Sequence, residues 1–207
     1  MDPDNPQLLA VEEASDILLD GGVIALPTDT VYGLVADATN PRAMEKLRQL
    51  KGRDSEKPIA VLVDSMGLFR KLAVNITPGM EALAAAFWPG AMTMIINKRS
   101  ASLKGASKDD TLGVRMPDHL VTLSVISMLS RPLAATSANL EGEPPIRTAE
   151  QIARKFGNQL DLIIDAGEIS GSGASTIIRA IEDEYELLRE GPISWERIED
   201  VLESLEE

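Results

Sequence analysis

The sequence contains no cysteine, and histidine occurs once, at position 119. The absence of thiols excludes disulfides, thiolate catalysis, zinc fingers and iron–sulfur clusters. A single histidine excludes a histidine-rich metal site, and a Ser-His-Asp triad would have to include His119. The neighbouring sequence offers His119 no carboxylate or nucleophile partner, so we expect it at the surface or at the start of a helix. We therefore assign no metal-ligating residue.

Aromatic residues are also scarce, with three Phe, two Tyr and two Trp in 207 residues. Modules that read RNA by stacking several bases depend on such side chains. Acidic residues outnumber basic ones by 33 to 20, which gives a formal charge of −13. Because this charge repels phosphate backbones, we expect direct RNA binding to be weak or absent, although a local basic pocket remains compatible with it.

Long apolar runs are missing too. No stretch approaches the roughly 18 apolar residues of a membrane span, and the acidic N-terminus does not resemble a signal peptide. We therefore expect a cytoplasmic protein without membrane contact. Length and composition predict a single domain over residues 1–207, with a core over about 6–193 and a C-terminal helix over about 194–205.

Apolar runs and capping signals predict strands and helices in irregular alternation. Asn5, Asn40 and Ser194 stand at helix-capping positions, and Thr77-Pro78 and the Thr148-x-x-Gln151 box begin two further helices. The order favours a mixed sheet in an α/β domain. We expect helices over 6–20, 41–50, 78–88, 118–129, 149–156 and 194–205, and strands over 23–26, 59–63, 92–97, 112–116, 132–136, 162–165, 175–179 and 185–189.

Polar side chains cluster directly after the first predicted strand. The segment 27–33 reads Pro-Thr-Asp-Thr-Val-Tyr-Gly and brings two hydroxyls, a carboxylate and a phenol together. In α/β proteins, ligand groups are commonly presented at the carboxyl end of a strand. An Asp- or Thr-stabilised turn, with Gly33 supplying the backbone geometry, explains the same residues.

Three cations lie close together between a predicted helix and the strand 59–63. They are Lys51, Arg53 and Lys57. A triphosphate requires several cations, and an arginine adds bidentate hydrogen bonding. A solvated loop whose charges pair with Asp54 and Glu56 is the alternative interpretation.

Other candidate residues stand at the ends of predicted strands. Ser137 and Asn139 would point the same way in an extended backbone and suit phosphate or ribose contacts, although a simple turn also explains them. Arg115 lies in an apolar strand, where a cation must find a partner. Ser175 follows a glycine-rich loop that lacks the Walker ending, and Arg189 ends the last predicted strand.

Taken in order, these segments closely resemble the YrdC-like family. The 27–33 segment is followed by Lys-x-Arg, Trp-Pro-Gly-x-x-Thr, Val-Arg-Met-Pro, Ser-Ala-Asn, Ser-Thr-Ile and Leu-Arg-x-Gly, spanning about residues 21–193. Members of this family are the bacterial threonylcarbamoyl-AMP synthases. The resemblance implies a twisted mixed sheet with flanking helices and a positively lined cavity. It also implies the short form of the enzyme, since longer relatives carry an additional C-terminal domain.

The implied reaction converts L-threonine, bicarbonate or CO2, and ATP into threonylcarbamoyl-AMP and pyrophosphate. The adenylate then serves a separate tRNA threonylcarbamoyl transferase complex. Mg²⁺ is expected to bridge the phosphates, mostly through water and substrate oxygens. The resemblance assigns threonine binding to Thr30, Arg115, Ala135 and Ser175. It assigns ATP binding to Lys51, Arg53, Lys57, Thr111, Ser137, Asn139 and Arg189, with Lys51 and Arg53 neutralising the leaving pyrophosphate.

Two positions depart from the longer relatives, which often have Asn at Lys57 and His at Leu62. Lys57 can still serve phosphates, whereas Leu62 cannot replace a polar contact to threonine. Two rival functions remain open: an RNA-binding or ribosome-assembly module, and a paralogue that forms another carbamoyl-adenylate. The −13 charge and the few aromatics oppose the first, and the second would differ in the amino-acid pocket.

Overall fold

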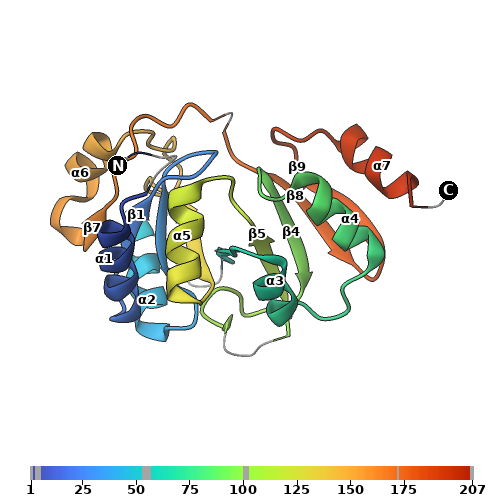
Figure 1. Ribbon diagram of the computed structural model, residues 1–207, viewed down its shortest axis with the longest axis horizontal. Helices are drawn as coiled ribbons and strands as arrows, with labels where there is room; N and C mark the ends of the chain where they lie inside the picture. The colour runs from blue at the N-terminus through green and yellow to red at the C-terminus, as the bar shows by residue number, and fades with distance from the viewer. Residues whose placement is uncertain (1, 3–5, 53–56, 100–102, 172, 206–207) are drawn as a thin grey trace.

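A computed structural model describes residues 2, 6–52, 57–99, 103–171 and 173–205 (Figure 1). The described residues form a mixed sheet of nine strands with helices packed on it, which confirms the predicted α/β class. The strands are β1 (Ile24–Leu26), β2 (Gly33–Asp37), β3 (Ala60–Leu62), β4 (Met92–Asn97), β5 (Thr111–Arg115), β6 (Leu133–Ser137), β7 (Leu162–Ile163), β8 (Thr176–Ile181) and β9 (Glu184–Arg189). The helices are α1 (Leu8–Leu19), α2 (Pro41–Lys51), α3 (Met66–Leu72), α4 (Pro78–Phe87), α5 (Leu120–Leu129), α6 (Ala149–Phe156) and α7 (Trp195–Glu203), with a short 3-10 turn, η2 (Gly157–Gln159).

The order of strands across the sheet is β7-β1-β2-β6-β3-β5-β4-β8-β9. Three neighbouring pairs run parallel, namely β1 with β7, β3 with β5, and β4 with β8, and the other pairs are antiparallel. Figure 1 shows α1, α2, α5 and α6 gathered at one end of this sheet, and α4 and α7 at the other. Strands β3 and β5 therefore lie in the middle of the molecule.

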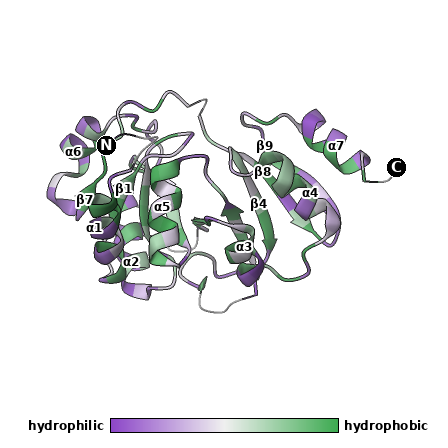
Figure 2. Cartoon of the chain, in the orientation of Figure 1, coloured by the Kyte–Doolittle hydropathy of each residue, from purple (hydrophilic) through white to green (hydrophobic). Residues whose placement is uncertain are grey.

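Side chains alternate between the two faces of the sheet, as the two-residue period of a strand requires. One face buries Ala25, Val61 and Met94 in the larger hydrophobic cluster, together with side chains of α2, α3, α4, α6 and α7. The other face buries Ile24 and Leu62 in a smaller cluster with α1 and α5. Figure 2 shows the strands largely in the hydrophobic colour, while α7 carries hydrophilic patches.

Capping side chains start three helices where the sequence predicts them. The side chains of Asn40, Thr77 and Thr148 accept hydrogen bonds from backbone N–H groups in the first turns of α2, α4 and α6. The last of these helices ends at Phe156, as predicted. The predicted hairpin of residues 175–189 is also present, since β8 and β9 pair antiparallel around Glu182 and Asp183.

Other predicted boundaries are wrong. Helix α1 begins at Leu8 rather than at Pro6, its capping residue Gln7 makes no side-chain bond, and Asn5 lies outside the described residues. Ser194 occupies the capping position of α7 without a side-chain bond. His119 precedes α5, as expected of a helix-start residue. The predicted strands are one residue longer than β1 and two residues longer than β3 and β7, while β6 has the predicted length but begins one residue later.

Strand β2 and helix α3 are absent from the prediction for physical reasons. Strand β2 starts with Gly33 and ends with Asp37, two residue types that are depleted in strands, yet all five of its residues are buried. Helix α3 has only seven residues, too few for a clear helical period, and begins where Ser65 accepts a bond from Leu68 N. None of the helices in the described part of the chain has both the length and the apolar character that a bilayer crossing requires.

Replacement of Asn40 by alanine should lower the free energy of unfolding by about 1 kcal/mol, because α2 would lose its capping oxygen. Ser194→Ala is the matched control, since the Ser194 side chain makes no capping bond in the structure. Urea denaturation of both variants measures the difference. Equal losses of stability would contradict the assigned caps.

Candidate functional site

A cavity of about 340 Å³ opens on the sheet face that also carries the smaller hydrophobic cluster. Alternate residues of the central strands form its floor, including Ala60 and Leu62 of β3, Gly113 of β5 and Thr93 of β4. The cavity has room for a ligand because several of these residues are small. A Cβ built on Gly113 would already lie 3.4 Å from Thr93 Cγ2. The strands thus bury a core on one face and leave space for a ligand on the other.

The buried guanidinium of Arg115 lines this cavity at the end of β5. Its Nε donates to Gly90 O at 2.9 Å, its Nη1 donates to Thr30 Oγ1 at 2.9 Å, and its Nη2 forms an ion pair with Asp29. The side chain of Arg115 therefore connects the loop after β1 to β5. The sequence-based expectation that Arg115 must find a partner is confirmed.

A second arginine, Arg189, lines the same cavity from the end of β9. Its Nε and Nη2 donate to Ser175 O at 3.0 and 2.8 Å, and Ser175 Oγ lies 2.8 Å from Thr93 Oγ1. Although Arg189 as a whole residue is exposed, partial burial of its guanidinium lowers its pKa, and the positive charge of Arg115 lowers it further. Two like charges therefore face one space, which favours binding of anions there.

Lys51, Ser137 and Asn139 form a buried polar network at the edge of the cavity. Lys51 Nζ donates to Ser137 O at 2.8 Å, to Ser137 Oγ at 3.1 Å, and to Asn139 Oδ1. Ser137 Oγ donates to Asn139 Oδ1 at 2.6 Å. The predicted position of Lys51, between a helix and the strand 59–63, is wrong: Lys51 is the last residue of α2 and only 4% exposed. Burial is tolerated because oxygen acceptors surround the ammonium group.

The remaining candidates lie around this cavity or outside the described residues. Lys57 forms an ion pair with Glu141 near the surface. Thr111 begins β5 and shares a face with Gly113 and Arg115, although it is not among the residues that line the cavity. Ala135 and Leu62 do line the cavity. Leu62, at the position where longer relatives often carry histidine, therefore faces the cavity. Arg53 lies outside the described residues.

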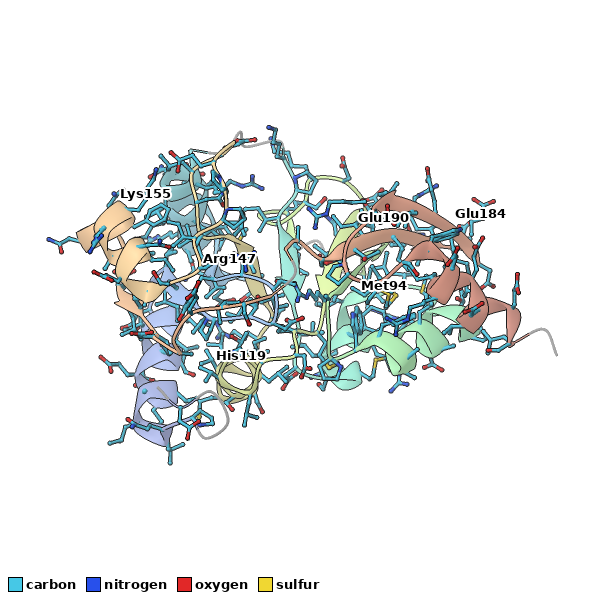
Figure 3. The ribbon with its side chains drawn as sticks, turned by 90° about the horizontal axis from the view of Figure 1, so that it is seen from above. Met94, His119, Arg147, Lys155, Glu184 and Glu190 are labelled. Atoms are coloured by element: carbon cyan, nitrogen blue, oxygen red, sulfur yellow. The ribbon has the colours of Figure 1, made fainter. Side chains whose placement is uncertain are left out.

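The loop after β1 packs against the segment that joins β7 to β8. Tyr32 Oη donates to Gly167 O at 2.8 Å and accepts from Ala166 N at 3.0 Å. Arg147, which is labelled in Figure 3, donates to the carbonyl oxygens of Ile169 and Gly171. Gly171 approaches this loop so closely that a Cβ would lie 2.3 Å from the backbone oxygen of Asp29. These contacts fix the backbone that carries Thr30.

Thr93 and Asp29 are two residues of this region to which the sequence patterns above assign no role. Thr93 is buried on the cavity wall and contacts Ser175 through its hydroxyl. A signal for it was present, because it is the last residue of the Trp-Pro-Gly-x-x-Thr segment. Asp29 belongs to the 27–33 segment, but its pairing with Arg115 joins residues 86 positions apart. No local pattern indicates such a pair.

Comparison with known proteins identifies the family. The Sua5/YciO/YrdC family model, described as "Telomere recombination", matches residues 16–191. The chain belongs to the Sua5/YciO/YrdC family. It is 36% identical over 190 residues to a threonylcarbamoyl-AMP synthase of Pyrococcus abyssi, covering 91% of this chain and 56% of that relative. A threonylcarbamoyl-AMP synthase of Vibrio parahaemolyticus is 35% identical over 188 residues, covering 87% of this chain and 98% of that relative.

Solved structures of the Sua5/YciO/YrdC family share this fold. The crystal structure of P. abyssi Sua5 complexed with L-threonine has a TM-score of 0.88 and 35% identity, covering 96% of this chain and 58% of that one. Escherichia coli YciO has a TM-score of 0.87 at 24% identity and covers 96% and 97% of the two chains, a likeness in fold alone. The chain thus spans just over half the length of some relatives, such as P. abyssi Sua5, and nearly all of others. The YrdC-like fold expected from the sequence is confirmed.

Replacement of Lys51 by methionine should lower the free energy of unfolding by about 1–3 kcal/mol, because buried oxygens would lose their shared donor. Lys57→Met should change it by less than about 1 kcal/mol, since Lys57 forms only an exposed ion pair. Chemical denaturation of both variants provides the measurement. A Lys51→Met protein as stable as Lys57→Met would show that the buried network does not support the fold.

Proposed function

We propose that this protein is a nucleotidyltransferase that forms threonylcarbamoyl-AMP and pyrophosphate from L-threonine, bicarbonate or CO2, and ATP. The observation that carries the proposal is the convergence of Arg115 and Arg189 on one hydroxyl-lined cavity. Both threonine and ATP bring anionic groups, a carboxylate and a triphosphate, and two separate cations suit two separate anions. The likeness to relatives named threonylcarbamoyl-AMP synthase supports this choice of substrates.

Threonine is placed against Arg115. Its carboxylate would accept from the guanidinium, while Thr30 and Ser175 offer hydroxyls for the amine and the side chain, and the Ala135 backbone lines the same space. Thr30 and Ser175 are buried, so a substrate hydroxyl between them would form hydrogen bonds to them in a site with little water. Such bonds are strongly selective, because the wrong substrate leaves buried groups unpaired.

ATP is placed toward Arg189 and the network of Ser137 and Asn139, with Thr111 at the nucleotide. Lys51, Arg53 and Lys57 supply further positive charge for the phosphates. Among the described residues, no group of three or more His, Cys, Asp or Glu side chains is arranged to hold a metal ion. We therefore assign Mg²⁺ to phosphate oxygens and water, which is the coordination it commonly keeps with nucleotides.

The reaction needs orientation more than a covalent catalyst. The threonine amine adds to CO2 and loses a proton to give a carbamate, whose oxygen then attacks the α-phosphorus of ATP as pyrophosphate leaves. Holding the reactants in the correct geometry supplies much of the acceleration, and fixed positive charge stabilises the departing pyrophosphate. The adenylate would pass to a tRNA threonylcarbamoyl transferase complex.

Replacement of Arg53 by alanine should lower turnover about a hundredfold or more, since one oriented charge contact supplies about 3–4 kcal/mol in a transition state. Thermal stability should change little. Arg70→Ala is the control, because Arg70 forms an exposed ion pair with Glu81 on α3 and α4. Pyrophosphate release and thermal denaturation measure the two effects. Wild-type turnover in Arg53→Ala would remove its role at the phosphates.

Threonine should be the best amino acid, serine a measurable second, and valine close to inert. Loss of the methyl group costs about 1–3 kcal/mol, whereas loss of a hydroxyl that is read by buried groups costs more. Rates of amino-acid-dependent pyrophosphate release, compared as kcat/KM, test this order. If the kcat/KM for valine equals that for serine, the pocket does not recognise the side-chain hydroxyl.

The same assay separates the rival functions. Carbamoyl phosphate or ammonia outperforming threonine would favour a paralogue that makes another carbamoyl-adenylate. Steeply salt-dependent RNA binding without ATP turnover would favour an RNA-binding module.

A further inference from the structure

Asp29 lies behind the cavity and not in its lining, as far as the described residues define that lining. Its Oδ1 receives two donors: Arg115 Nη2, and the backbone N–H of Asp118 at 3.1 Å. The side chains of the Arg115–Asp29 pair are 8% and 17% exposed. Because water and salt screen this pair less than a surface ion pair, its bonds can define where the arginine points.

The hydrogen bonds of Arg115 account for three of its five N–H donors. Nε donates to Gly90 O, Nη1 to Thr30 Oγ1, and Nη2 to Asp29. Among the described residues, one N–H on each terminal nitrogen is left for a ligand in the cavity that Arg115 lines. A carboxylate can accept from both nitrogens of such a fork at once.

The charge of Asp29 also lets two arginines share the cavity before a ligand arrives. The positive charge of Arg115 acts on Arg189 and lowers the pKa of that guanidinium. The carboxylate of Asp29 offsets part of this repulsion from the side of Arg115 that is turned away from the ligand. Without it, Arg115 would keep its bonds to Gly90 and Thr30, but its Nη2 would lose the partner that sets its direction.

We infer that Asp29 is a positioning residue: it fixes the guanidinium of Arg115 so that its remaining N–H groups face the carboxylate of the amino-acid substrate. The inference rests on the proposed function, and it adds a residue that would act through Arg115 without touching threonine. Loss of this positioning weakens a contact that the substrate makes before and during the reaction. Such a loss raises KM with little change in kcat.

The test compares Asp29→Asn with Asp37→Asn. Asp37 is the matched control because it also accepts from an arginine, Arg131, and from a backbone N–H, that of Thr39, but lies outside the cavity lining. We expect Asp29→Asn to raise the KM for threonine by about tenfold to a hundredfold, as a small misplacement of a binding group can do, while the KM for ATP stays within about threefold. Asp37→Asn should leave both values near those of the wild type. An unchanged KM for threonine in Asp29→Asn, or an equal rise for ATP, would overturn the inference.

A second readout needs no substrate. The side-chain Nε–H of Arg115, assigned in NMR spectra with an Arg115→Lys variant, should exchange slowly with water in the wild type because it donates to Gly90 O. Asp29→Asn should accelerate this exchange about tenfold or more, and Asp29→Glu, which keeps the charge, should have an intermediate effect. Unchanged exchange in both variants would refute the positioning role. A wild-type protein that neither binds nor uses threonine would refute the proposed function instead, and the exchange rates would still decide the role of Asp29.

Discussion

The ion pair between Arg115 and Asp29 connects two parts of the chain on which the cavity depends. Arg115 ends β5, in the middle of the sheet, and Asp29 belongs to the loop that leaves β1. A charge buried at this point needs strong partners, and the chain provides them from Gly90, Thr30 and Asp29. The bonds that compensate for burial of the charge also hold β5 and the loop after β1 in a fixed relative position.

The cavity follows from the alternation of side chains along the central strands. Met94 and Val114 contribute to the larger core on one face, while Thr93 and Gly113 face the cavity on the other. Because each strand packs the core with one face and lines the cavity with the other, a substitution on the cavity face can alter ligand binding without removing core side chains. The small residue Gly113 matters in this respect, since a larger side chain there would reach into the ligand space.

The sequence predicts the features that depend on neighbouring residues. The helix starts at Asn40, Thr77 and Thr148, and the hairpin of β8 and β9, all come from short patterns that the structure confirms. The cavity itself is different, because its residues are drawn from segments far apart in the chain. The burial of Lys51 at a helix end could not be predicted for the same reason: its partners, Ser137 and Asn139, lie over 80 positions away.

In the proposed function, one cavity holds an amino-acid carboxylate at Arg115 and a nucleotide phosphate at Arg189. A crystal structure of the protein with L-threonine and a non-hydrolysable ATP analogue tests it most directly. The threonine carboxylate should accept hydrogen bonds from Arg115 beside Ala135, and phosphate oxygens should lie at Arg189 and Ser137. Threonine and the nucleotide bound outside this cavity, with Arg115 contacting only Asp29, Thr30 and Gly90, would contradict it.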